Sequence, residues 1–376
     1  MSCPTGSGFS RERWTALLSK FKITIPSTTM AGISSITTGP RQSNIELLRI
    51  FAMFLVLIVH VDFWTFGAPL PEEFVSSPGN AWIRTIVESV AIVCVNVFVL
   101  ISGWFGIRFS IRGLLNFIFQ CAYFLIGIYA VMMITGYAEL SFRGIAACFC
   151  LAGANWFILA YVGLYILSPV LNSFIEHATP TLYRRILILF FLFQTIYGFS
   201  NAADFFERGY STLSFVGLYL LARYVKNYHV GLVTRWGGMA YVFSVICNSV
   251  MYYAVTRLQI PIDVYAYVNP LVIIGSLGLL GFFWKLRIPS NRTINWVAKS
   301  AFAVLLLHLD PNIGVPIFKV RVMEIYDKFS GVSFLGMILV FLILVFSFAI
   351  ILDQPRKWIW NLIVKKWKDS SSGNHQ

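Results

Sequence analysis

The stretch IELLRIFAMFLVLIVH, residues 45–60, decides how this chain folds. With the residues that follow, it is long enough for a membrane-spanning helix, which needs about 20 residues. Besides Glu46 at its start, it carries the ionisable side chains Arg49 and His60. A charged group inside a membrane costs roughly 3 kcal/mol on insertion scales, so it usually marks a functional site. At 3.6 residues per turn, Arg49 and His60 share one helix face, ~16 Å apart along the axis.

The composition indicates a membrane protein. The 376 residues are 58% hydrophobic and 12% charged, whereas soluble domains contain about 25% charged residues. Because apolar runs recur from residue 45 to residue 352, we predict an all-α, polytopic transmembrane helical bundle. The net charge of +13 does not indicate nucleic-acid binding, since the basic residues flank apolar segments as membrane topology requires. The six cysteines form no disulfide or zinc pattern, and we expect no bound metal.

About ten apolar segments fit transmembrane helices. They are residues 45–66, 84–105, 114–134, 156–174, 186–199, 213–224, 239–255, 264–286, 296–316 and 333–352. The fifth and sixth are shorter than the ~20 residues that a span requires. The apolar run at residues 145–151 is also too short to span, and we expect it to lie at the interface or to re-enter the membrane.

The distribution of Lys and Arg orients these helices. With the N-terminus inside, the outer segments hold only a minority of the 29 basic residues. The outer ones are Arg84, Arg143, Arg208, Arg257, Lys319, Arg321 and Lys328. Cytoplasmic segments are enriched in Lys and Arg, so we expect both termini in the cytoplasm. Residues 1–40 are expected to form a disordered cytoplasmic tail, residues 41–352 the transmembrane domain and residues 353–376 a basic cytoplasmic tail.

Three separated motifs resemble the acyltransferase 3 family of integral membrane acyltransferases. IELLR at residues 45–49, followed after ten residues by His60, is similar to the family's R-x10-H motif on its first helix. VFVLISGW at residues 97–104 resembles the family's F-F-x-x-S-G element, and NWFIL at residues 155–159 resembles its W-F-L segment. AVLLLH at residues 303–308 is similar to the late Y-x-x-Y-L-x-H motif, but it lacks both tyrosines. The role of His308 therefore stays open.

The resemblance implies an O-acyltransferase of the bacterial plasma membrane. Acetyl-coenzyme A would be the donor substrate, without a permanently bound cofactor. The acceptor would be a hydroxyl of a surface polysaccharide, a lipopolysaccharide or a lipid-linked sugar, and both direct transfer and an acyl-histidine intermediate remain open. The alternative is a transporter or flippase for a lipid-linked sugar or small metabolite. A transporter is expected to carry charges in two pseudo-symmetric halves, whereas here they cluster in the first two predicted helices.

Two residues are the candidates for catalysis. His60 is expected to act as the general base that takes a proton from the acceptor hydroxyl, and burial favours the neutral imidazole that this role needs. Glu88 lies at a matching depth in the second predicted helix, where its carboxylate would orient the imidazole. The alternative for Glu88 is an ion pair with Arg84, one helical turn away.

Basic residues predict the donor site. Arg49, Arg108 and Arg112 are expected to form a mouth for the phosphates of coenzyme A, although topological anchoring also accounts for Arg108 and Arg112. They follow the Ser102-Gly103 element, where a glycine allows a backbone or the pantetheine arm to pass closely. The ~16 Å between Arg49 and His60 suits a long, narrow arm that reaches from phosphates to thioester.

Overall fold

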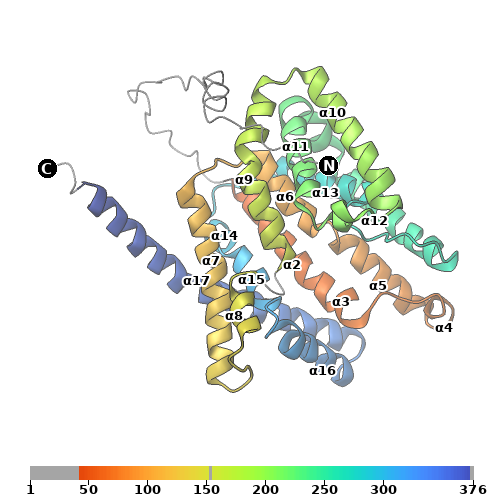
Figure 1. Cartoon of the computed structure of the whole chain (residues 1–376). Coiled ribbons are helices and arrows are strands. Elements are labelled where there is room, and N and C mark those ends of the chain that lie inside the picture. Colours follow the sequence, from red (N-terminus) through yellow and green to blue (C-terminus); the bar gives the residue numbers. More distant parts are fainter. Residues whose placement is uncertain (1–41, 152–154, 373–376) are drawn as a thin grey trace, which may run out of the picture. The chain divides into compact units, whose positions relative to one another are not determined.

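The computed structural model describes residues 42–151 and 155–372, and these residues contain helices without any β-strand. The all-α prediction is therefore confirmed for them, while the predicted tail at residues 1–40 lies outside the described residues. The helices of Figure 1 are α2 (Ser43–Val61), α3 (Phe63–Phe66), α4 (Glu73–Ser76), α5 (Pro78–Ala91), α6 (Cys94–Phe105), α7 (Ile111–Ile134), α8 (Phe142–Cys148), α9 (Trp156–His177), α10 (Pro180–Phe193), η1 (Gln194–Ser200), η2 (Asp204–Gly209), α11 (Thr212–Tyr228), α12 (Val230–Arg257), α13 (Pro270–Lys285), α14 (Arg292–Ala298), α15 (Ala301–His308), η3 (Gly314–Lys319), α16 (Val320–Lys328) and α17 (Gly331–Ser372).

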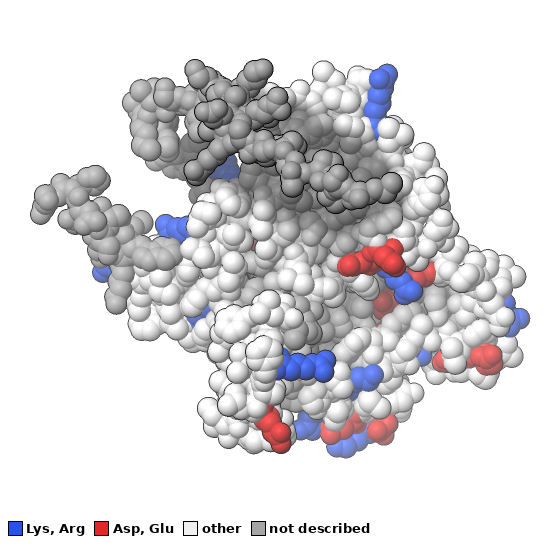
Figure 2. Space-filling view, viewed as in Figure 1, with Lys and Arg blue, Asp and Glu red and all other residues white. Residues whose placement is uncertain are grey.

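Within the described ranges, seven helical stretches are long and apolar enough to cross a membrane. They are Ser43–Phe66, Pro78–Phe105, Ile111–Ile134, Trp156–His177, Pro180–Ser200, Val230–Arg257 and Gly331–Lys365. The chain is thus a multi-pass α-helical membrane protein. Its drawn surface agrees, because Lys, Arg, Asp and Glu occupy few places in Figure 2 and most of the visible surface is neither acidic nor basic. A lipid-facing surface must avoid charge in this way.

The ninth predicted helix, residues 296–316, is wrong as a single helix. The chain divides there into α14, α15 and η3. After α15 ends at His308, a carboxylate oxygen of Asp310 accepts hydrogen bonds from the backbone and side-chain amides of Asn312, at 2.8 and 3.0 Å. Pro311 between them has no N–H to donate. This side-chain-stabilised turn replaces the helical hydrogen bonds and ends α15.

Two further helix boundaries differ from the sequence prediction. The eighth predicted helix starts at residue 264, but α13 begins at Pro270, preceded by Asn269, whose side chain accepts the N–H of Leu271 at 2.9 Å. Proline is favoured at a first helical position because its missing N–H would have no partner there. The last predicted helix ends at residue 352, but α17 continues as a helix to Ser372.

Glycines set how closely the helices around α6 and α13 approach each other. α12 packs along α13, and a Cβ atom at Gly237 would lie only 2.5 Å from the carbonyl oxygen of Gly278. Likewise, a Cβ atom at Gly103 of α6 would lie 2.6 Å from the carbonyl oxygen of Tyr219 in α11. Small residues at helix interfaces permit this backbone contact in membrane proteins.

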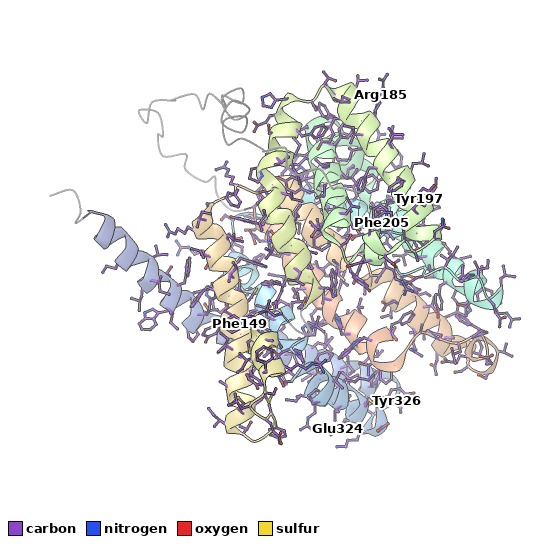
Figure 3. The ribbon with its side chains drawn as sticks, in the orientation of Figure 1. Phe149, Arg185, Tyr197, Phe205, Glu324 and Tyr326 are labelled. Atoms are coloured by element: carbon purple, nitrogen blue, oxygen red, sulfur yellow. The ribbon has the colours of Figure 1, made fainter. Side chains whose placement is uncertain are left out.

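The two ends of the helical bundle carry residues that the sequence predicted on opposite sides of the membrane. Arg185, near the start of α10, belongs to a segment expected inside, whereas Glu324 and Tyr326 of α16 follow basic residues expected outside. Figure 3 places Arg185 at one end of the described helices and the two α16 residues toward the opposite end. This arrangement is compatible with the expected topology.

Candidate active site

A large cavity lies where α2, α5, α7, α9 and α15 meet the segment before α13. Its volume is about 1070 Å³, at the upper end of the ~300–1,000 Å³ typical of ligand pockets. Aromatic residues make up much of its wall: Phe63, Trp64, Tyr129, Tyr137, Trp156, Phe157, Tyr210, Tyr265 and Tyr267. Four carboxylates, from Glu88, Glu139, Asp263 and Asp310, also line it, with Arg143 as a basic residue. We call this space the main cavity.

His60 occupies the last turn of α2 and lines the main cavity. Its Nδ1 lies 2.6 Å from the carbonyl oxygen of Val56, one turn earlier on the same helix. Since a carbonyl oxygen only accepts, Nδ1 carries the hydrogen of the neutral ring. The ring is half-buried, and it packs edge-on against Trp64 with ring centroids 5.6 Å apart.

The second histidine of the site is His308, the last residue of α15. Its side chain is buried, and its Nδ1 lies 2.6 Å from the carbonyl oxygen of Val304, so this nitrogen also carries a hydrogen. The Nε2 of His308 therefore has a lone pair, and it lies 3.4 Å from Nδ1 of His60. The two rings meet edge-on with centroids 5.1 Å apart.

These contacts determine which nitrogen of His60 is available. Nδ1–H donates to the Val56 carbonyl and also faces the lone pair of His308. Nε2 of His60 has no hydrogen bond to any described residue, and it carries the lone pair of this tautomer. The site thus presents an unprotonated nitrogen on a ring that lines the cavity, backed by a second ring that accepts from its other nitrogen. This is the arrangement of a general base with an orienting partner.

Glu88 lines the same cavity, but its contacts differ from the prediction. The described hydrogen bonds of the His60 ring go to Val56 and His308, and none goes to Glu88. Glu88 is 2% exposed, and its Oε2 has no hydrogen-bond partner among the described residues. A buried carboxylate oxygen without a partner is costly in a fold. Glu88 therefore lines the cavity with an oxygen that accepts no hydrogen bond from a described residue. The ring next to His60 is that of His308, in place of the predicted Glu88 carboxylate.

The alternative ion pair between Glu88 and Arg84 does not form. Arg84 donates to Asp62 at 2.9 Å and to Glu73 at 3.5 Å, and also to the carbonyl oxygen of Gly67. These contacts join the end of α2, the loop at Gly67 and α4 to α5. Arg84 thus ties down the chain just beyond His60 and leaves the carboxylate of Glu88 facing the cavity.

Arg49 lies near the start of α2 and lines a second cavity of about 550 Å³. Its Nε forms an ion pair with Glu46 at 3.4 Å. Ser102 lines the same space, and its hydroxyl lies 3.1 Å from that of Tyr161. Phe157 lines both cavities, so it forms part of the wall between the space at Arg49 and the space at His60.

The other predicted donor-site residues lie elsewhere. Arg108 and Arg112 are exposed, and neither lines the main cavity or the cavity at Arg49. The predicted convergence of the three arginines is therefore not seen, because the chain turns away at Gly106 before α7 begins at Ile111. Gly103 is buried, and the close approach that it permits is that of α11 at Tyr219. The basic neighbours of Arg49 are instead Lys299, Arg356 and Lys357.

Sequence reasoning undervalued one residue and missed others. His308 was visible in AVLLLH at residues 303–308, but this stretch lacks the tyrosines of the family motif. The sequence predicts that Arg356 and Lys357 belong to a tail, because they follow the last apolar run. Tyr210, in the loop before α11, also lines the main cavity, and burial raises the pKa of its phenol. This residue keeps its proton at neutral pH and is available as a donor.

Comparison with protein families matches residues 42–354 to the acyltransferase 3 family, described as an acyltransferase domain. Comparison with curated proteins and with solved structures gave no match. The match to the family model spans nearly the whole helical part of the chain, and it includes both histidines of the site. The chain belongs to this acyltransferase family.

Proposed function

We propose that this membrane acyltransferase transfers an acetyl group from acetyl-coenzyme A to a hydroxyl of a surface polysaccharide, a lipopolysaccharide or a lipid-linked sugar, in a bacterial plasma membrane. The observation that carries the proposal is the pair of His60 and His308 at the main cavity. Nδ1 of His60 is held by Val56 and faces Nε2 of His308 at 3.4 Å. This leaves Nε2 of His60 as the base.

In this mechanism, Nε2 of His60 removes the proton of the acceptor hydroxyl as its oxygen attacks the thioester carbonyl. The new C–O bond forms, the C–S bond breaks, and the proton on His60 passes to the departing thiolate. During the step His60 becomes an imidazolium, and its Nδ1–H then donates more strongly to Val56 and to the lone pair of His308. His308 is accordingly a positioning residue that stabilises the charged ring.

The wall of the main cavity supports a sugar as the acceptor. Tyr and Trp rings offer apolar faces with polar edges, and carboxylate oxygens accept hydrogen bonds from hydroxyl groups. Both kinds of side chain line the space next to His60. Glu88 is the best-placed acceptor, because its Oε2 is buried without a partner. A substrate hydroxyl that donates to Glu88 would supply the missing hydrogen bond.

The experiment is acetyl transfer by the purified protein in lipid nanodiscs, with labelled acetyl-coenzyme A and candidate sugar acceptors. The wild type should consume the thioester and label the acceptor. His60→Ala should lower transfer by about 10²–10⁴-fold, the usual worth of general-base help, while expression and membrane insertion stay at wild-type levels. Near wild-type transfer by His60→Ala would overturn the mechanism. Sugar movement across the membrane without thioester consumption would favour a transporter.

A further inference from the structure

The cavity at Arg49, which we call the basic cavity, is lined by four basic residues. Its basic lining residues are Arg49, Lys299, Arg356 and Lys357. No carboxylate is among its lining residues in the described part of the chain. The polar side chains of Asn116, Gln120 and Asn361 complete one wall. A space lined by cations and amide groups suits a ligand with several anionic oxygens.

A buried carboxylate behind the cavity holds two of these cations in place. Asp353 is fully buried; it accepts from Nε of Arg356 at 2.9 Å and pairs with Nζ of Lys357 at 3.3 Å. Gln120 of α7 donates to the same carboxylate at 3.3 Å. These bonds fix the chain at residues 353–357 against α7. The cations are therefore preorganised before any ligand arrives, which reduces the entropy that binding must overcome.

The hydroxyl of Ser300 connects this cluster to the helix that carries His308. It accepts from Nζ of Lys357 and, at 3.2 Å, from the amide of Gln354. α15 begins at the next residue and ends at His308. The two helices that bring the histidines together thus both border this cavity, α2 at Arg49 and α15 at its start. A helix rises ~1.5 Å per residue, so Arg49 and His60 are ~16 Å apart along α2.

Phe157 is the common wall of the two spaces. Its ring stacks on Tyr161, with centroids 5.9 Å apart and planes 12° apart, and it contacts Phe98 and Phe302 at 6.5 and 6.0 Å. Phe98, Tyr161 and Phe302 line the basic cavity, whereas Phe157 lines both. A ligand whose anionic end occupies the basic cavity must therefore pass this aromatic wall at Phe157 to reach the main cavity.

We propose that Arg49, Lys299 and Lys357, together with Arg356, which Asp353 holds in place, bind the phosphate groups of the nucleotide end of the acyl donor. The inference rests on the proposed function, because it takes acetyl-coenzyme A as the donor. The sequence predicts the donor's phosphate site at Arg108 and Arg112, which are exposed. The inference places it instead at Lys299, which follows α14, and at Lys357, in the second half of α17. The pantetheine arm then runs past Phe157 and presents its thioester at His60.

An anionic phospholipid headgroup carries the same phosphate chemistry, so the experiment must separate the two sources. Coenzyme A and adenosine 3′,5′-bisphosphate are titrated calorimetrically into purified protein in nanodiscs of neutral phosphatidylcholine. The first variant is Lys299→Gln, which alters an exposed side chain. The second is Lys357→Gln, which alters a side chain that contacts Asp353 and Ser300. Arg287→Gln is the matched control, because Arg287 is exposed and lines neither cavity. Thermal unfolding in nanodiscs with and without phosphatidylglycerol reports lipid binding.

The expected result is that Kd for both nucleotides rises about tenfold in Lys299→Gln and in Lys357→Gln, the effect of losing one charge-assisted phosphate contact. Arg287→Gln should bind as the wild type does. Unchanged Kd values in both lysine variants would overturn the inference, as would a loss restricted to stabilisation by phosphatidylglycerol. His60-dependent transfer with unchanged donor Kd in the variants would remove this site but leave the proposed function standing. A wild type that neither binds coenzyme A nor transfers acetyl would remove both.

Discussion

Replacing His308 tests the proposal that His60 is the base and that His308 positions it. In His308→Leu the lone pair that faces Nδ1 of His60 is lost, whereas Val56 still accepts from that nitrogen at 2.6 Å. The lost contact is long, at 3.4 Å between nitrogens, compared with ~2.9–3.0 Å for a common hydrogen bond. Its contribution should therefore be small in the neutral ring and larger once His60 is an imidazolium.

A hydrogen bond to a charged group contributes about 1.5–3 kcal/mol, and the long distance places this one at the lower end. Because ~1.4 kcal/mol corresponds to a factor of ten in rate, His308→Leu should lower kcat about tenfold. The KM for acetyl-coenzyme A should not change, since the interaction strengthens only when the proton moves. His308→Gln provides a matched control, because its side-chain oxygen accepts at a similar reach and should restore much of kcat.

The assay is steady-state acetyl transfer by purified variants in nanodiscs, with thermal unfolding measured on the same samples. A purely structural role for His308 would lower kcat and Tm together in both variants, without rescue by glutamine. Wild-type kcat in a stable His308→Leu protein would also refute the reasoning. Either outcome would leave His60 as a base without an orienting ring.

Three further predictions follow from other parts of the structure. Glu88→Gln should raise the KM for the acceptor up to about tenfold without raising that for the donor, as expected for the loss of a hydrogen bond to the substrate, and it should not lower Tm, because Oε2 is unpartnered; kinetics with each substrate varied will decide this. Gly103→Ala should destabilise the protein by about 1–3 kcal/mol, since its Cβ would lie 2.6 Å from the Tyr219 carbonyl oxygen. Gly127→Ala should not destabilise it, because a Cβ there meets nothing within 4 Å; thermal unfolding of both variants tests this. Single cysteines placed after Phe66 and after Ser372 should react with a membrane-impermeant maleimide from outside and from inside, respectively, and labelling of both from one side would contradict the expected topology.

The sequence was sufficient to place candidate residues that lie on a single helix. Arg49 and His60 lie on a single apolar segment, and their spacing follows from helix geometry alone. The structure confirms that this segment is helical and places each residue on a cavity. Hydropathy could not predict the helix boundaries at residues 264–269 and 309–313. There, turns stabilised by Asn269 and Asp310 interrupt stretches that are apolar on average.

Contacts between distant segments account for what the sequence could not predict. His60 and His308 are 248 residues apart, and no local pattern states which helix ends will meet. The same is true of Lys357 and Ser300, which join α17 to the start of α15. At residues 353–357 the composition predicts a cytoplasmic tail, because basic residues after an apolar run usually mark a cytoplasmic end, but it does not show that these residues pack against other helices. Here Asp353 supplies the buried partner that draws Arg356 into the bundle.

The pairing of α2 with α15 gives the site a property that neither helix has alone. Arg49 on α2 and Lys299 just before α15 both line the basic cavity, and each helix carries a histidine in its last turn. Packing the two side by side therefore aligns a positive end with a proton-accepting end at a separation that the helical rise fixes. A donor with phosphates at one end and a thioester at the other matches that polarity. A substitution that shifted α15 along α2 would misalign both ends together, so it should weaken donor binding and slow proton transfer at the same time.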